Sequence, residues 1–163
     1  MDRFKTVPNS VLDRLASDDD RNQLIINAII QTQAKSVLLF ANSVAHAQTL
    51  SIMLELRGEK SAAISHETDP SARRYFIRGF GEGRIKVLCN YGVLTTGFDA
   101  PKTDLIVISR PVMSPVLYMQ MVGRGMRGPK NGGTERCEVI TVNDNLREYS
   151  DKLAHHFCKQ YFS

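Results

Sequence analysis

Three short runs rich in apolar residues constrain the fold of this chain more than any other feature of its sequence. They are SVLLFA at 36–41, IKVLCN at 85–90 and DLIVIS at 104–109. A continuous apolar run of about four to eight residues is typical of a strand that is covered on both faces, as in a parallel sheet between helices. Two further strands are predicted at 60–65 and 136–142.

Segments with helical periodicity lie between these runs. The first helix is predicted over 21–33 with Asp20 as its N-cap. Its apolar face would consist of Leu24, Ile25, Ala28 and Ile29. Two more helices are predicted at 114–123 and at the C-terminal end, 146–163.

The second helix is predicted over 43–58 and the third begins at Pro70. Ala47, Leu50, Leu54 and Glu55 recur near helical spacing in the second helix, which would end at Gly58. Proline suits the first turn of a helix because the N–H that it lacks has no intrahelical partner there.

Strands that alternate with helices predict one α/β domain, with a parallel sheet in a three-layer α/β/α arrangement and right-handed crossovers. The domain is expected over 21–145, after a polar arm at 1–20 and before the C-terminal helix at 146–163. In such sheets the working surface lies beyond the carboxyl ends of the strands. The loops that follow the predicted strands, ANS, SHETD, NYGVLTTGFDAP and SRPVMS, should therefore converge on one edge.

Composition excludes little. The net charge is +4 and the pI is about 9.1, which suits a nucleic-acid partner but is also common without one. Three widely spaced cysteines, with no C-x-x-C pair, predict neither a zinc site nor a disulfide framework, and Cys89 and Cys137 are expected to be buried. No run approaches the ~18 apolar residues of a membrane span, so a cytoplasmic protein without a membrane partner is predicted.

The segment QMVGRGMRG, 120–128, places two arginines three residues apart among glycines. Arg124 and Arg127 would point the same way from the end of a helix, and two adjacent guanidiniums repel unless an anion lies between them. Each flanking glycine costs helix stability of ~1 kcal/mol, which argues against an ordinary solvated surface. The anion predicted here is a polyphosphate whose charge develops in a transition state.

The segment LTTGFDAP, 94–101, offers groups that suit a nucleotide. Gly97 permits close approach of the backbone, Asp99 could accept hydrogen bonds from sugar hydroxyls, and the hydroxyls of Thr95 and Thr96 suit phosphate oxygens. A plain turn, whose geometry Asp99 and Pro101 set, explains the same residues.

These motifs resemble those of superfamily 2 helicases and translocases. QMVGRGMR resembles the family's Q-x-x-G-R-x-x-R motif, VLCNYGVLTTGFDAP the motif before it, and SVLLFANSVAHAQTL the first motif of the C-terminal RecA-like domain. The matches keep the family's order between about residues 20 and 145. GFDAP, SRPVMSPVLYMQMVGRGMRG and VND resemble more narrowly the branch of DNA repair helicases and of type I and III restriction-enzyme motor subunits.

The resemblance implies a role for each matching residue. Arg124 and Arg127 would contact the γ-phosphate of ATP, and Gln120 would orient the neighbouring motif or the attacking water. Residues that border the nucleotide would be Gly97, Asp99 and Gly123. Residues at the nucleic-acid backbone would be Ala41, Asn42, Ser43, His66, Asn90 and Thr95.

Two of the matching positions keep alternatives. Arg73 would either bind nucleic acid or brace the loop of Asp99, and His66 is equally explained as a loop histidine satisfied by its neighbours.

The sequence contains neither G-x-x-x-x-G-K-[ST] nor a D-E-x-[DH] box. The resemblance therefore implies a RecA-like domain without its own P-loop, which acts on ATP and Mg²⁺ held mainly by an N-terminal RecA-like domain, in the same chain or in a separate polypeptide. The isolated segment would be inactive. DNA is expected rather than RNA as the nucleic acid.

Two other functions fit parts of the sequence. A non-catalytic nucleic-acid-binding or regulatory module would bind strands without needing its arginines. A Rossmann-like nucleotide-sugar enzyme would require a Gly-rich first turn, whereas the turn here reads FANSVAHAQ.

Overall fold

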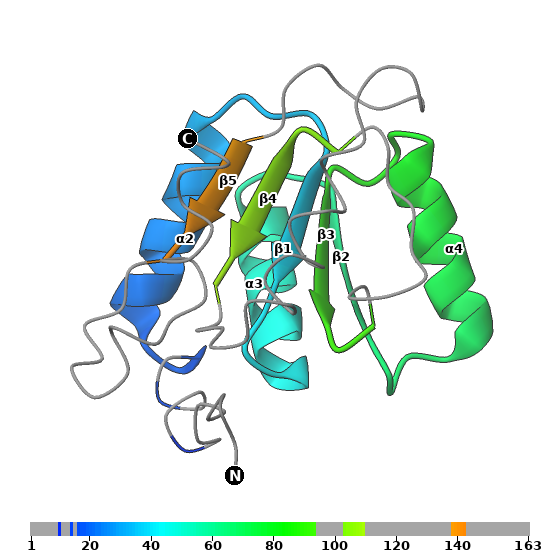
Figure 1. Ribbon diagram of the computed structural model, residues 1–163, viewed down its shortest axis with the longest axis horizontal. Coiled ribbons are helices and arrows are strands. Elements are labelled where there is room, and N and C mark those ends of the chain that lie inside the picture. Colours follow the sequence, from blue (N-terminus) through cyan, green and yellow to red (C-terminus); the bar gives the residue numbers. More distant parts are fainter. Residues whose placement is uncertain (1–9, 11–13, 15, 94–102, 110–137, 143–163) are drawn as a thin grey trace, which may run out of the picture.

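The computed structural model describes residues 10, 14, 16–93, 103–109 and 138–142, and these contain one five-stranded parallel sheet (Figure 1). The strands are β1 (Val37–Phe40), β2 (Ser61–Ser65), β3 (Val87–Tyr91), β4 (Leu105–Ile108) and β5 (Glu138–Thr141). Their order across the sheet is β2-β3-β1-β4-β5, and every neighbouring pair is parallel. The predicted parallel α/β fold is confirmed.

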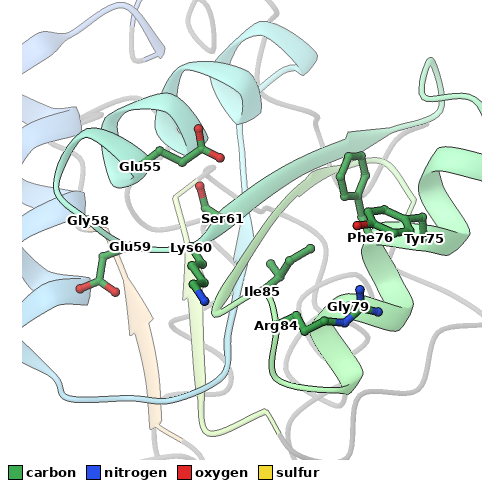
Figure 2. Close-up of a pocket in the computed structure, with 10 residues that line it drawn as sticks. All are labelled: Glu55, Gly58, Glu59, Lys60, Ser61, Tyr75, Phe76, Gly79, Arg84 and Ile85. Atoms are coloured by element: carbon green, nitrogen blue, oxygen red, sulfur yellow. The ribbon is translucent and has the colours of Figure 1, made fainter.

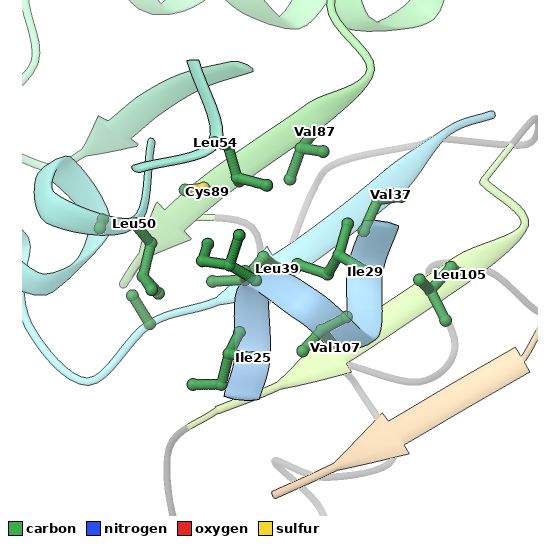
Figure 3. Packing of buried hydrophobic residues seen from close by; sticks show 13 residues of the cluster. Ile25, Ile29, Val37, Leu39, Leu50, Leu54, Val87, Cys89, Leu105 and Val107 are labelled. Atoms are coloured by element: carbon green, nitrogen blue, oxygen red, sulfur yellow. The ribbon is translucent and has the colours of Figure 1, made fainter. Parts of the chain in front are cut away.

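Three described helices cover the two faces of the sheet (Figure 1). The helices α2 (Asp19–Gln31) and α3 (Val44–Leu56) pack on one face, and α4 (Pro70–Gly81) packs on the other. Successive side chains of β1 point to opposite faces of the sheet, so this strand contributes to both cores. Leu38 and Phe40 belong to the cluster on the α4 side, and Val37 and Leu39 belong to the cluster below α2 and α3. Figure 3 shows this second cluster.

The first helix starts earlier than predicted and is rotated relative to the predicted face. Asp18, not Asp20, is the N-cap, since its carboxylate accepts a hydrogen bond from the Arg21 N–H at 3.1 Å. Asp20 instead lies in the first turn, where the helix dipole favours a negative charge. The predicted core residue Leu24 is 68% exposed, whereas Ile26 is fully buried beside Ile25 and Ile29. Both faces satisfy helical spacing, so only packing distinguishes them.

The other two helices match their predicted limits closely. Ala47, Leu50 and Leu54 of α3 are buried, while Glu55 is exposed. Pro70 is the first residue of α4, behind the N-cap Asp69, whose carboxylate accepts from two backbone N–H groups. The helix predicted at 114–123 and the C-terminal helix lie outside the described residues.

Cys89 is fully buried in β3, as predicted. Burial raises the pKa of its thiol well above the ordinary value, so it stays protonated and packs as a small apolar side chain. Cys137 and Cys158 lie outside the described residues.

Gly58 ends α3 in the left-handed region at φ +84°. Replacing Gly58 with alanine is expected to lower the free energy of unfolding by about 1 kcal/mol, because a Cβ strains this backbone conformation even though no atom lies within 4 Å of it. Urea denaturation measures the change. Gly81→Ala is the control: its Cβ also meets open space, its φ is not positive, and it should be neutral or stabilising.

Candidate functional site

The carboxyl ends of the central strands lie at one level. In register, Phe40 of β1 pairs with Asn90 of β3 and with Ile108 of β4. Just beyond, the Ala41 N–H donates to the Asn90 carbonyl at 2.9 Å, and the Ser109 N–H donates to the Phe40 carbonyl at 3.0 Å. The first residues after these strands therefore lie side by side at one edge of the sheet, as the sequence predicted.

The three residues after β1 that were predicted to contact nucleic acid mainly have structural roles. Ala41 and Asn42 are buried, and the partly exposed Ser43 is the N-cap of α3, where its Oγ accepts from the His46 N–H at 3.1 Å. What this loop offers to a ligand is the first turn of α3, where backbone N–H groups lack intrahelical acceptors and favour anions.

Asn90 is also fully buried, near the end of β3. Its Nδ2 donates to the Leu39 carbonyl at 2.9 Å, and its Oδ1 has no hydrogen-bond partner among the described residues. An acceptor left unpaired in a buried site costs stability unless it is reserved for another group. Contact between Asn90 and nucleic acid stays a prediction.

His66 is exposed in the turn after β2 and lies beside the loop that follows β3. A Cβ built on Gly92, which adopts φ +78°, would lie 3.9 Å from His66 Nδ1. Arg73 sits in the first turn of α4 and is partly exposed. The structure thus brings His66 to the predicted edge, and both alternatives for Arg73 stay open because Asp99 lies outside the described residues.

The remaining predicted site residues are not described by the structure. They are Thr95, Gly97, Asp99, Gln120, Gly123, Arg124 and Arg127. Their assignments stay predictions.

A buried polar network beneath the edge was not predicted from the sequence. The Asn42 N–H donates to His46 Nδ1 at 3.0 Å, His46 Nε2 lies 2.8 Å from Asn22 Oδ1, and Asn22 Nδ2 donates to the Ala16 carbonyl at 2.9 Å. His46 and Asn22 are 1% and 3% exposed. Asn22 lies one helical turn before Ile25 and Ile26, on the same face of α2. A polar residue on an otherwise apolar helix face was the signal that could have identified it.

Arg21, the neighbour of Asn22, joins the same helix to the end of β4. It is buried, and its guanidinium Nη2 donates to the Ser109 carbonyl. The Ser109 hydroxyl in turn donates to the Phe40 carbonyl at 2.7 Å. Two successive polar residues of α2 therefore contact His46 of α3 and Ser109, the residue that follows β4.

Burial, and to a lesser extent the nearby positive charge of Arg21, together lower the pKa of His46 to about 4. The imidazole is therefore neutral at neutral pH. Because the Asn42 N–H can only donate, Nδ1 must be the acceptor, and the single ring proton sits on Nε2 and is donated to Asn22 Oδ1.

This shift predicts acid sensitivity. The unfolded chain protonates His46 as the pH falls through its ordinary value of 6.5, whereas the folded chain does so only at about 4. The free energy of unfolding should therefore decrease by about 3 kcal/mol between these two pH values, and this contribution should be constant above 6.5. Urea denaturation as a function of pH measures it. His46→Gln should lose this part of the slope, and an unchanged slope would contradict the assignment.

A hollow of about 490 Å³ lies at the opposite edge of the sheet, beside Ser61 at the start of β2 (Figure 2). In its wall, the Arg84 guanidinium lies 5.6 Å from the centre of the Tyr75 ring, and Arg84 also pairs with Glu82 at 2.8 Å. Both charged side chains are about half exposed, so this pair contributes little to stability. Arg84 is therefore a suitable control position, remote from the carboxyl edge.

Within the part of the chain that the structure describes, no three or more His, Cys, Asp and Glu side chains are grouped to hold a metal ion. In the same residues, no helix is long and apolar enough to cross a membrane.

Comparison with known proteins identifies the family. Residues 20–129 match the family described as the helicase conserved C-terminal domain, and the chain belongs to it. The fold is accordingly that of the C-terminal RecA-like domain of superfamily 2 helicases. The C-terminal domain of the DEAD-box protein Dbp5 aligns with a TM-score of 0.72 at 22% identity, over 88% of this chain and 79% of that one.

Two curated relatives are similar in sequence. IRC3 of Saccharomyces cerevisiae, whose name assigns it to the ATP-dependent helicases, is 31% identical over 143 residues, which are 85% of this chain and 20% of that protein. The ATP-dependent rRNA helicase RRP3 of Candida albicans is 24% identical over 143 residues, 87% of this chain and 26% of that protein. The chain thus spans about a fifth to a quarter of the length of these relatives.

Proposed function

We propose that this chain acts as the second motor domain of an ATP-dependent helicase or translocase of superfamily 2. Its carboxyl-edge loops would bind the nucleic-acid backbone, and its arginine motif would reach ATP and Mg²⁺ held mainly by an N-terminal RecA-like domain. The observation that carries this proposal is the family match over 20–129, a range that contains both the described edge and the motif at 120–127.

The described edge supports backbone binding rather than reading of bases. Its accessible groups are the partly exposed first turn of α3, the exposed imidazole of His66 and the partly exposed side chain of Arg73 at the start of α4. Helix N-termini and cationic side chains suit phosphates, which carry no sequence information. The net charge of +4 favours the same partner.

Arg124 and Arg127 would act across the cleft between the two domains. Their guanidiniums would stabilise the charge that develops on the γ-phosphoryl group, with Gln120 beside them. Attraction to ATP would close the cleft, and its loss after hydrolysis would let the cleft open. Because the strand-binding loops belong to this domain, each cycle would move them relative to the other domain.

We further propose DNA as the nucleic acid, in repair or restriction, on the likeness of GFDAP and SRPVMSPVLYMQMVGRGMRG to that branch. The name of the relative RRP3 specifies rRNA for that protein, so RNA is the alternative to be tested. No preference for sequence is expected on either substrate, since the proposed contacts are to phosphates.

ATP hydrolysis tests the proposal in a protein that unites this chain with its P-loop domain. The rate is measured with no nucleic acid, with single- and double-stranded DNA, and with RNA of the same length. Stimulation by DNA alone is expected, whereas stimulation by RNA alone would exclude the DNA assignment. Strand binding without any hydrolysis would favour the non-catalytic module, and hydrolysis by the 163-residue chain alone would contradict the two-domain mechanism.

A further inference from the structure

Buried side chains link one helix to the loop after β1 and to the residue that follows β4. From α2, Asn22 reaches His46, which accepts from the backbone N–H of Asn42, and Arg21 reaches the carbonyl of Ser109. We propose that Arg21, Asn22 and His46 form an internal brace that positions the loop after β1 for strand binding relative to the chain leaving β4. This inference rests on the proposed function, because it assigns a positioning role within that same edge.

The brace acts on the backbone at the point where the proposed strand contact begins. Asn42 immediately precedes Ser43, the N-cap of α3, so the bond from its N–H to His46 Nδ1 fixes the direction in which the first turn of α3 faces. The Ser43 hydroxyl accepts from the N–H of the same histidine. One residue thus holds both sides of the turn, from its ring and from its backbone.

Arg21 extends the brace to the end of β4. Ser109 is the last described residue before 110–137, and the predicted arginine motif lies in that segment. Arg21 contacts the Ser109 carbonyl, and the Ser109 hydroxyl contacts the Phe40 carbonyl in the strand that leads to Asn42. Consecutive residues of α2 therefore hold Ser109, which follows β4, and, through His46, the loop after β1, which suits a domain that must move its parts as one rigid unit.

A neutral His46 is required for this arrangement, since a protonated ring could not accept from the Asn42 N–H. Among the described residues, Arg21 is the charged group whose field acts on His46 from α2, and it disfavours protonation as burial does. A cation beside the ring thus keeps Nδ1 available as an acceptor.

Two substitutions of His46 separate positioning from simple filling of space. In His46→Asn, the amide oxygen takes the place of Nδ1, so the contact with Asn42 is kept while the contact with Asn22 is lost. In His46→Gln, the longer side chain reaches Asn22 but offers no acceptor at Nδ1. Both variants remove the ring, so both should lose stability to a similar extent.

The variants are compared in the protein with its P-loop domain by single-stranded DNA and RNA affinity, and in the 163-residue chain by hydrogen exchange of the Asn42 amide. We expect His46→Gln to weaken strand affinity roughly tenfold and to speed Asn42 exchange roughly tenfold, the loss of one buried hydrogen bond. His46→Asn should stay within about threefold of wild type in both, and Arg84→Ala should change neither.

The outcomes are distinguishable from failure of the proposed function. Wild-type protein that binds neither DNA nor RNA would overturn the proposed function. Strand binding that His46→Gln and His46→Asn weaken equally would overturn the brace and leave the function standing. If neither variant folds, ¹⁵N NMR of the wild-type ring decides: an unprotonated Nδ1 coupled to the Asn42 N–H supports the brace, and a protonated Nδ1 overturns it.

Discussion

Replacing Arg124 with alanine is expected to lower the rate of ATP hydrolysis by at least about 10³-fold in a protein that combines this segment with a P-loop domain. The guanidinium would meet negative charge that increases in the transition state, so kcat should fall much more than nucleotide affinity. Single-turnover hydrolysis and binding of a nucleotide analogue measure the two effects separately. Arg127→Ala should behave similarly.

Two controls make this result specific. Arg124→Lys retains the positive charge without the planar fork of donors, so it should recover only a small part of the rate. Arg84→Ala removes a half-exposed arginine at the far edge of the sheet and should leave hydrolysis unchanged. Hydrolysis by Arg124→Ala at the wild-type rate would exclude its role at the γ-phosphate.

Replacing Leu39 with alanine is expected to lower the free energy of unfolding by about 3–5 kcal/mol, which would largely unfold a domain of ordinary stability. Leu39 is fully buried in the middle of β1, the central strand, beneath Ile25 and Ile29 of α2 (Figure 3). Because layers on both faces hold this strand, the cavity can collapse only in part. Urea denaturation followed by circular dichroism gives the loss.

Leu24→Ala is the matched control for Leu39→Ala. It removes the same atoms from α2 at a position that is 68% exposed, so the free energy of unfolding should stay within about 0.5 kcal/mol of wild type. A large loss at Leu24 with little loss at Leu39 would mean that α2 packs through the face that its sequence pattern first indicated.

The fold could be predicted from the sequence because its signals are local. Apolar runs at 36–41, 85–90 and 104–109 read as strands buried on both faces, and each forms one. Gly58 marks the end of one helix and Pro70 the start of another, and each signal depends on only a few neighbouring residues. The signals failed where several neighbours were equivalent, as with the three aspartates at 18–20, of which Asp18 is the cap.

The candidate site could be predicted only in part. The pattern of loops after parallel strands placed Asn42, His66 and Asn90 at one edge, and the structure brings them there. It also buries Asn42 and Asn90, which a motif does not reveal. Burial depends on what covers a residue, and the covering elements come from distant parts of the chain.

By itself, the sequence determined the parallel α/β sheet, the helices around it and the superfamily 2 motifs, because residue spacing and turn chemistry act over a few positions. The tertiary structure alone decided the strand order, the buried face of α2 and the network of Asn22 and His46. The network joins Asn22 to His46, 24 positions along the chain, and Arg21 contacts Ser109, 88 positions away. Such contacts exist only once the sheet has brought its strands together, so no local pattern encodes them.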